Sequence, residues 1–415
     1  MSAATYRAVL AVPGLARLVG GSQLARVGQA MGSVVLILFV LAHYGSAGLA
    51  GLAVFLSVFP GLMVSPVAGA LLDRRGRVLL ITLDYAIAGV GIGSLGLLSL
   101  AGALPAGLLL AICAVSSLTT ALSNTGTRSL FPVLVPRELW DRANAIDSSG
   151  YVVALVIGPA LGGVLVAAAG GQWALIGTGL VYALAALVVA GVRDLPASAA
   201  RRAGGLLEDA RLGVLYVMRS PSLRGLAIAL SVSNLGFGIF IVALPLRVLD
   251  HLGGGPGEVG ALWAMSGVGG VAGALWAGRY DSEGRERLFL GGGMLVAAMG
   301  LVLVLLASNV AVAGVGMALI GAGNGPVDIG LFSLRQRRTD KRWVGRAFAV
   351  SMSLNYCGMP IGSAIGGQLA GRSVTAALVV AIAIVVGSSV LPGLIIPAAE
   401  EVAEAPLPSR ARAVR

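Results

Sequence analysis

The sequence predicts an all-α membrane protein with twelve transmembrane helices, arranged as two six-helix bundles in parallel repeat. Three observations lead to this class: the composition, the spacing of apolar runs along the chain, and a set of motifs that occurs twice. Of the 415 residues, 57% are hydrophobic and only 11% are charged, whereas a water-soluble domain carries about 25% charged residues. So few charges cannot cover a water-facing surface, which indicates that the surrounding solvent is a lipid bilayer.

The apolar runs have the length that a bilayer requires. A helix rises about 1.5 Å per residue, so crossing about 30 Å of hydrocarbon takes about 20 apolar residues. Twelve runs meet this requirement: 17–43, 48–72, 78–100, 106–128, 145–169, 173–192, 224–249, 257–279, 288–306, 310–334, 346–370 and 374–397. The first run is too long and too polar for a cleaved secretory signal, so we expect it to remain as a helix.

The positive residues indicate how these spans are oriented, because they gather in alternate loops and at both termini. The rich loops hold Arg74, Arg75 and Arg77; Arg128, Arg137 and Arg142; Arg193, Arg201, Arg202, Arg211 and Arg219; Arg279, Arg285 and Arg287; and Arg335, Arg337, Arg338, Lys341, Arg342 and Arg346. The opposite loops hold only Arg247 and Arg372. The positive-inside rule therefore predicts a multi-pass protein of the cell inner membrane with both termini in the cytoplasm. The arginines stand in short clusters between apolar runs and do not gather on one face of a polar domain, which argues against nucleic-acid binding.

Two motifs occur once in each half of the chain, at nearly the same separation. The first comprises Gly61, Ser65, Gly69, Asp73, Gly76 and Arg77, matched by Gly269, Gly273, Ala277, Asp281, Gly284 and Arg285. The second is Arg142-Ala-Asn-Ala followed by Gly158, Gly162 and Gly163, matched by Arg346-Ala-Phe-Ala followed by Gly362, Gly366 and Gly367. We interpret the chain as two parallel halves, at residues 1–192 and 223–399.

A polar segment, residues 193–222, joins the two halves. Apolar residues recur within it at three- and four-residue spacing from Leu206 to Met218, until Pro221 ends the pattern. This spacing predicts an amphipathic helix on the cytoplasmic membrane surface, with a simple tether as the alternative. The last residues, 400–415, combine prolines with scattered charges and are predicted to form a disordered cytoplasmic tail.

The twelve spans, the parallel repeat and the charged loop after the second span together resemble the major facilitator superfamily (MFS). The stretch from Gly69 to Arg77 looks like the signature loop of that family, and Gly158-Pro159 followed by Gly162-Gly163 is similar to its exporter element. The segment Arg128-Ser-Leu-Phe-Pro-Val-Leu-Val-Pro-Arg-Glu138 resembles the macrolide-efflux and enterobactin-exporter branch. The resemblance covers essentially the whole chain and implies the MFS fold and the activity of a drug–proton antiporter.

Three positions depart from the pattern of the drug antiporters. Ala154 stands where the exporter element usually begins with an earlier glycine, and Gln29 stands where relatives often carry an acid. The span 106–128 also lacks the mid-membrane arginine that is linked with proton transfer in that family. These departures bear on coupling to protons more than on the direction of transport.

The resemblance implies a cytoplasmic latch that forms when the inner ends of the two halves meet. Its predicted members are Gly69, Asp73, Arg74, Gly76, Arg77, Arg128, Asp281 and Arg285. The carboxylate of Asp73 can accept hydrogen bonds from arginines or from a helix start near Trp343–Arg346. The alternative is that these arginines only fix the topology. In the span 145–169, Gly158, Pro159, Gly162 and Gly163 are predicted to bend the helix and seal one face of a central cavity.

Polar residues inside spans are costly in lipid, so they mark candidate sites. The predicted cavity residues are Gln23, Arg26, Gln29, Asn234, Phe237, Phe240, Asn324 and Asp328. In the span 17–43, Ser22, Arg26, Gln29 and Ser33 recur so that they share one helix face. The glycines and Pro326 around Asn324 are expected to break the span 310–334, as in transporters with discontinuous helices.

Alternatives stay open for the charged members of this set. Arg26 either holds an anionic substrate, responds to a protonated acid, or extends its charged end to the cytoplasmic interface. Asp328 either carries a proton or closes an inner gate with Arg128. Three other acids near span ends, Asp84, Asp147 and Glu258, are expected to have structural roles. Cys113 and Cys357 fall inside spans, which argues for buried thiols and against a disulfide framework.

The sequence shows no apparatus for catalysis. It has no Walker loop, and its two histidines, His43 and His251, lie near outer loops, so we expect no enzyme, metal site or cofactor. The predicted function is secondary active export of amphiphilic small molecules such as drugs, antibiotics or siderophores, by alternating access and proton antiport. The alternatives are a solute importer or facilitator and a transport-inactive sensor. The expected partners are a small-molecule substrate and membrane lipid, with no nucleic acid, and the expected state is a monomer.

Overall fold

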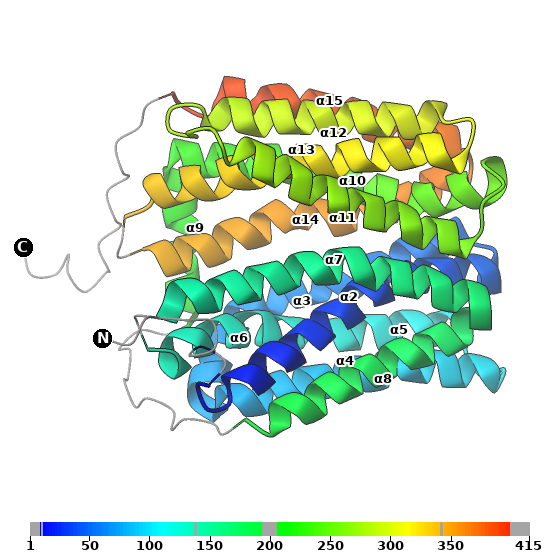
Figure 1. The fold of residues 1–415 in the computed structure, drawn as a ribbon, viewed down its shortest axis with the longest axis horizontal. Helices are drawn as coiled ribbons and strands as arrows, with labels where there is room; N and C mark the ends of the chain where they lie inside the picture. The colour runs from blue at the N-terminus through cyan, green and yellow to red at the C-terminus, as the bar shows by residue number, and fades with distance from the viewer. Residues whose placement is uncertain (1–8, 10, 137–138, 193–205, 341–342, 399–415) are drawn as a thin grey trace, which may run out of the picture.

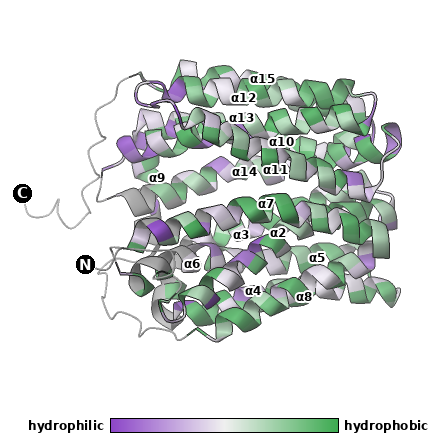
Figure 2. Ribbon diagram, viewed as in Figure 1, coloured by the Kyte–Doolittle hydropathy of each residue, from purple (hydrophilic) through white to green (hydrophobic). Residues whose placement is uncertain are grey.

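The computed structural model describes residues 9, 11–136, 139–192, 206–340 and 343–398. In these ranges the chain forms helices joined by short turns, and it contains no strand. The long helices run side by side along the longest axis of the molecule (Figure 1). Figure 2 shows apolar residues along the shafts of the helices and hydrophilic residues mainly toward their ends, as expected for a bundle surrounded by lipid.

Seven helices are described in the first half of the chain. They are α2 (Leu15–Tyr44), α3 (Ala47–Arg75), α4 (Arg77–Leu100), α5 (Ala106–Ser117), α6 (Thr120–Leu134), α7 (Trp140–Ala169) and α8 (Gly171–Ala190). The fourth predicted span is therefore split into α5 and α6. The break lies at Leu118–Thr119, where the N–H of Leu118 donates to Val115 O instead of continuing the α-helical pattern.

The second half contains six long helices, and a shorter helix, α9 (Leu206–Arg219), precedes it. The six are α10 (Pro221–His251), α11 (Pro256–Ala277), α12 (Glu286–Leu306), α13 (Val310–Arg337), α14 (Val344–Ala370) and α15 (Val374–Ile395). Eleven helical segments of the described chain are long and apolar enough to cross a membrane. The predicted span 346–370 falls on α14, which is not among these eleven, so the count of twelve spans stays a prediction.

The two ends of the bundle differ in charge. We call one end arginine-rich: it carries α9, the start of α2, the end of α15 and the turns around Gly76 and Gly284 (Figure 1). The other, the arginine-poor end, carries the turns at 45–46, 101–105, 252–255, 307–309 and 371–373. Gly76 and Gly284 both have positive φ, at 91° and 70°, a conformation that side chains with a Cβ rarely adopt. The matched glycines thus share a positive φ, although Gly76 is the single residue between α3 and α4 whereas Gly284 lies in the longer turn between α11 and α12.

Glycines join the two halves at the arginine-poor end. A Cβ on Gly367 of α14 would lie 3.0 Å from the Cα of Gly51 on α3, and a Cβ on Gly163 of α7 would lie 2.8 Å from the Cα of Gly260 on α11. Small residues permit such backbone contact, which stabilises helix pairs in lipid, where apolar burial provides little driving force. We call these two contacts the α3–α14 and α7–α11 seams.

The helix α9 is docked on protein. Its Tyr216 and Val217 have no exposed surface, and the Tyr216 ring stacks on Trp343 with 5.3 Å between ring centroids. The backbone N–H of Asp340 donates to the Tyr216 hydroxyl at 3.0 Å. The apolar face predicted for the linker is therefore covered by α10, α14 and α3 in addition to any contact with lipid.

Candidate functional site

One face of α2 lines the space between the two halves. Gly21 and Gly28 pack against α8, while Val27 and Met31 contact Gly158 on α7, so the face carrying Gln29 and Ser33 points away from both neighbours. Gln29 and Ser33 are exposed, although the residues from Val34 to Val40 that follow them are buried. Because this polar surface lies midway along a helix that is otherwise covered, it faces an interior space.

Arg26 forms an ion pair inside the first half. Its Nη2 lies 2.8 Å from Oδ1 of Asp147 on α7, and its Nη1 donates to the backbone oxygen of Asp147 at 3.0 Å. The guanidinium also lies over the Tyr151 ring, 5.7 Å from the centroid. With the Gln23 amide turned so that its oxygen faces Arg26, this oxygen accepts from Nη1 at 3.0 Å, and the amide nitrogen donates to the Gly150 oxygen at 3.0 Å. The charge of Arg26 is thus compensated by Asp147, a partner that the sequence analysis did not find.

The second half contributes a matching polar face on α13. Gly321 and Gly325 pack against α11, whereas Gly323 and Gly330 pack against the opposite neighbour, α12. Asn324 and Asp328 lie one turn apart on a third face and are both exposed. Met317 and Arg335 lie on that same face, one toward each end, and are buried. The exposed surface of Asn324 and Asp328 therefore belongs to an interior space and not to the lipid-facing surface.

The prediction that α13 is interrupted near Asn324 is wrong. The helix α13 runs without interruption from Val310 to Arg337 and contains Pro326. Its glycines allow the backbone of α13 to contact α11 on one side and α12 on the other. These close contacts hold the helix in place. The discontinuous helix is instead the fourth predicted span, at Leu118–Thr119 between α5 and α6.

The predicted residues of α10 divide between two environments. The Asn234 amide donates to the backbone oxygen of Asn355 on α14 at 2.8 Å, and Phe237 is half-buried. Phe240 has no exposed surface and packs against Trp263, with 6.1 Å between ring centroids. Asn234 and Phe237 thus lie at the inner surface of the second half, while Phe240 belongs to the apolar core.

A buried arginine in α13 was treated by the sequence analysis as part of a loop cluster. Arg335 has no exposed surface, and its guanidinium lies 5.0 Å from the centroid of the Phe348 ring on α14. With the Asn355 amide turned so that its oxygen faces Arg335, this oxygen accepts from Nη2 at 2.6 Å. Its Nε and Nη1 atoms have no hydrogen-bond partner. The signal in the sequence was its spacing of seven residues from Asp328, which places both on one helix face.

A buried acid lies beside the break in the fourth span. Asp84 on α4 is only 3% exposed and faces the hydroxyls of Thr119 and Ser123, which flank the start of α6. Its Oδ1 atom has no hydrogen-bond partner. The other acid near a span end, Glu258, caps α11 by accepting from the backbone N–H of Gly255 at 2.9 Å, which is a structural role.

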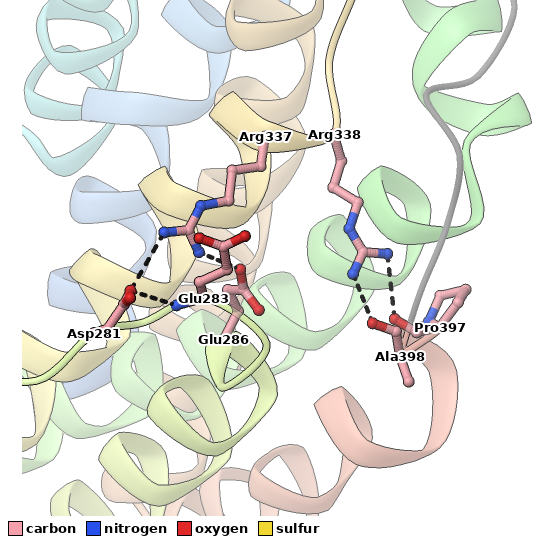
Figure 3. A network of polar contacts seen from close by, with 7 residues as sticks. All are labelled: Asp281, Glu283, Glu286, Arg337, Arg338, Pro397 and Ala398. Carbon is pink, nitrogen blue, oxygen red and sulfur yellow. Dashed lines mark hydrogen bonds and ion pairs between the residues drawn. The ribbon is translucent and has the colours of Figure 1, made fainter.

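In the second copy of the predicted latch, Asp281 makes its contacts with residues of its own half. Arg337 of α13 lies 2.6 Å from Oε1 of Glu286 and 3.7 Å from Oδ1 of Asp281 (Figure 3). Asp281 also accepts from the backbone N–H of Glu283 at 2.9 Å. Arg285, directly before α12, is exposed. Asp281 therefore holds the turn before α12 against α13.

For the first copy of the latch motif, the structure describes the backbone and only some of the side chains. Gly76 separates α3 from α4, and Arg77 is the first residue of α4. The side chains of Asp73, Arg74 and Arg128, together with the surroundings of Gly69, lie outside the described set. Their role in a latch stays a prediction.

The exporter element holds α7 against both a neighbour in its own half and a helix of the other half. A Cβ on Gly158 would lie 2.9 Å from the Val27 oxygen of α2, and one on Gly162 would lie 3.0 Å from the Met31 oxygen. Gly163 forms the α7–α11 seam, where Gly260 approaches the Pro159 oxygen. The element therefore packs α7 against the middle of α2 and, through Gly163, against α11 at the arginine-poor end.

The arrangement offers groups that can bind a small molecule. Among the described residues, no group of three or more His, Cys, Asp or Glu side chains could hold a metal ion. The interior surface presents amides, a hydroxyl and one carboxylate from α2 and α13, which belong to different halves. Such a surface can bind a small molecule that has both polar and apolar parts.

Comparisons with known proteins agree with this architecture. The profile of the Major Facilitator Superfamily matches residues 18–363 and 226–414. An uncharacterised MFS-type transporter, y4rN of Sinorhizobium fredii, is 36% identical over 91% of this chain and 93% of its own length. The multidrug efflux pump Tap of Mycobacterium tuberculosis is 26% identical, covering 92% of this chain and 93% of the pump.

Two further similarities extend the comparison. The enterobactin exporter EntS of Shigella boydii is 29% identical over 78% of this chain and 77% of its own length. The solved structure of a bacterial homologue of the human lysosomal transporter Spinster, inward-facing and occupied, has a TM-score of 0.69 at 17% identity, covering 94% of this chain and 97% of the other. The chain is a multi-pass membrane protein of the transporter class, and it belongs to the Major Facilitator Superfamily.

Proposed function

We propose that this protein is a secondary active exporter that moves amphiphilic small molecules out of the cell by alternating access. In this proposal the arginine-rich end faces the cytoplasm, in line with the positive-inside rule, and the protein resides in the cell inner membrane as a monomer. The substrate class includes drugs, antibiotics and siderophore-like molecules.

The observation that carries the proposal is the interior polar surface shared by the two halves. Gln29 and Ser33 lie midway along α2, and Asn324 and Asp328 lie midway along α13. Partly polar molecules fit a site in which a few fixed amide and carboxylate groups stand among apolar side chains. A site near the middle of the membrane, between two repeats, is also where secondary transporters bind their substrates.

The seams supply a physical basis for alternating access. Both join the halves at the arginine-poor end through backbone contacts between glycines, and in the α3–α14 seam the Ser363 hydroxyl also donates to the Gly51 oxygen at 3.3 Å. Contacts of this kind can separate and re-form as one half rocks against the other, because no salt bridge has to be broken there. The interior surface would then be reached from either end in turn.

The direction of transport is supported by the names of the relatives, since Tap is described as an efflux pump and EntS as an exporter. The energy source in the proposal is the proton gradient. The sequence has no Walker loop for nucleotide hydrolysis, and the interior surface carries an acid, Asp328, that can exchange a proton.

The experiment is transport in proteoliposomes with fluorescent amphiphiles and an imposed pH gradient of either sign. We expect substrate movement against its own gradient when protons flow the opposite way, and reversal when the pH gradient is reversed. Protein-free liposomes control for passive partition. Flux that ignores the pH gradient would contradict proton antiport, and the absence of flux for every amphiphile would favour a transport-inactive sensor.

A further inference from the structure

The break in the fourth span, at Leu118–Thr119 between α5 and α6, encloses a carboxylate that no described positive group compensates. Asp84 of α4 is only 3% exposed, and its Oδ1 atom has no hydrogen-bond partner. It forms no ion pair with a described residue, since Arg26 of the same half is paired with Asp147. An unpaired charge enclosed among spanning helices is costly, so this carboxylate requires a positive partner.

The groups that face Asp84 are hydroxyls whose protons point elsewhere. They belong to Thr119 and Ser123, which flank the start of α6. Thr119 Oγ1 donates to the backbone oxygen of Ser116, and Ser123 Oγ donates to that of Thr120. A hydroxyl whose only proton is engaged offers lone pairs to its other neighbours. Oxygen atoms from α4 and from the break therefore face one another without a proton donor among them.

These hydroxyls are held only loosely by the backbone. An O–H···O hydrogen bond is usually about 2.7–2.8 Å long, and Ser117, at the end of α5, donates to the Ala114 oxygen at 2.8 Å. The corresponding distances for Thr119 and Ser123 are both 3.3 Å. Their oxygens can therefore move toward an ion without the loss of a strong hydrogen bond.

The end of α5 supplies a second kind of oxygen ligand. The N–H of Leu118 donates to the Val115 oxygen and does not continue the α-helical pattern. The last carbonyls of a helix lack regular partners within it, and those of α5 lie within a few residues of Thr119. In secondary transporters, unwound carbonyls and the C-terminal ends of half-helices coordinate sodium ions or protons. The break thus offers carbonyl oxygens next to the two hydroxyls.

We propose that Asp84, Thr119 and Ser123 bind a sodium ion, which fastens the break in the fourth span to α4. Carboxylate, hydroxyl and carbonyl oxygens are hard ligands, which suit ions of this kind and not soft metals. One carboxylate balances one monovalent ion and leaves the occupied site neutral, whereas calcium sites take 6–8 oxygens and gain affinity from several charged ligands. The site does not depend on which substrate the protein moves or in which direction.

Sodium binding to the purified full-length protein in detergent tests the proposal, at constant pH and chloride concentration. Radioactive sodium should bind, and unlabelled sodium chloride should displace it while choline chloride should not. Sodium chloride should also raise the melting temperature above that in choline chloride, by roughly 2 °C or more at saturation. Asp84→Asn should abolish both effects. Absence of bound sodium, or equal melting temperatures in the two salts, would overturn the proposal and indicate a protonated Asp84.

Two buried serines beside the break provide a matched pair of variants. Ser123→Ala removes a proposed ligand and should weaken sodium binding about tenfold. Ser117→Ala removes a hydroxyl that is firmly bonded to the Ala114 oxygen and should leave sodium binding unchanged. Equal weakening in the two variants would reject Ser123 as a ligand and contradict the site.

Hydrogen exchange of the wild-type protein keeps the proposal testable if the variants fold poorly. Sodium chloride, compared with choline chloride, should slow exchange of the backbone N–H groups in residues 116–122 severalfold and leave α12 unchanged. Uniform slowing in all helices, or no slowing at the break, would reject a site there. None of these measurements requires transport, so failure of the sodium site and failure of the exporter function are told apart.

Discussion

The Arg26 guanidinium donates to the backbone oxygen of Asp147 and also pairs with its carboxylate, so one residue of α7 receives both contacts from α2. The second half makes a related contact in a neutral form, because the Asn234 amide of α10 donates to the backbone oxygen of Asn355 on α14. Each half therefore fastens its first long helix to the helix that carries the exporter element or its repeat. Only the first half uses charge for this.

Removing one member of the charged pair should destabilise the protein more than removing both. Asp147→Asn leaves Arg26 in a largely enclosed place without its carboxylate, and we expect a loss of about 2 kcal/mol or more. The double variant Arg26→Gln, Asp147→Asn should recover a large part of this loss. Thermal unfolding of the purified variants in detergent measures both. Additive losses in the double variant would show that the pair does not act as a unit.

The α7–α11 seam should not tolerate a side chain. A Cβ on Gly163 would lie 2.6 Å from the Pro256 oxygen, which is a backbone atom and cannot turn aside. We expect Gly163→Val to keep the arginine-poor end from closing, which would reduce transport severalfold and increase labelling of a cysteine placed near Gly257. The control is Gly292→Val on α12, where a Cβ meets nothing within 4 Å. Equal transport by both variants would contradict the assignment of the seam.

The two acids that face Arg337 should differ in importance. Glu286 is 2.6 Å from the guanidinium with a side chain only 7% exposed, whereas Asp281 is 3.7 Å away with a side chain 79% exposed. Exposed pairs contribute about 0–1 kcal/mol and enclosed pairs contribute more to stability when broken. Glu286→Gln should therefore lower the melting temperature clearly, and Asp281→Asn only slightly. The reverse order in a thermal unfolding experiment would refute this ranking.

The first copy of the latch motif should matter more for transport than the second. Asp281 is bound within its own half, which leaves Asp73 as the acid that the family resemblance assigns to the latch. We expect Asp73→Asn to reduce flux in proteoliposomes more than Asp281→Asn, at similar amounts of folded protein. A size-exclusion profile of each variant checks folding. Similar flux in the two variants would argue that the charged loop only fixes topology.

The docking of α9 should depend on the Tyr216 ring more than on its hydroxyl. Tyr216→Phe removes the acceptor for the Asp340 N–H, which contributes about 1 kcal/mol. Tyr216→Ala also removes the stack on Trp343 and leaves a cavity, at a cost of about 3–5 kcal/mol. Hydrogen exchange in α9 and in the first turns of α14 measures the release. Similar exchange in the two variants would mean that stacking contributes little to docking.

The spacing within one helix predicted part of the α2 face. Gln29 and Ser33 are exposed on one side, as residues four apart should be, whereas Ser22 is buried and Arg26 turns toward α7. The fold class and the family followed from the apolar runs and from motifs that act locally. Contacts between helices could not be predicted in this way. The partner of Arg26 is Asp147 on α7, and nothing in the local pattern of either residue names the other.

The interruptions of helices were predicted in the wrong place for a physical reason. Glycine and proline weaken an isolated helix, which pointed to the region around Asn324. In the protein, the glycines of α13 pack against α11 and α12, and these contacts keep the helix continuous. The break at Leu118–Thr119 has neither residue type, and it coincides with the buried Asp84 and with hydroxyls that can bond to the backbone.

This break makes the two halves mechanically unequal. The fourth span has a joint at Leu118–Thr119, whereas its counterpart, α13, is a single rod that carries Asn324 and Asp328 on one side. A continuous helix transmits a displacement of its arginine-rich end to Asn324 and Asp328. A displacement of α6 can instead be taken up by rotation at the joint with α5. Two spans at matching places in the repeat thus differ in continuity, and the polar face of the second half lies on the unbroken one.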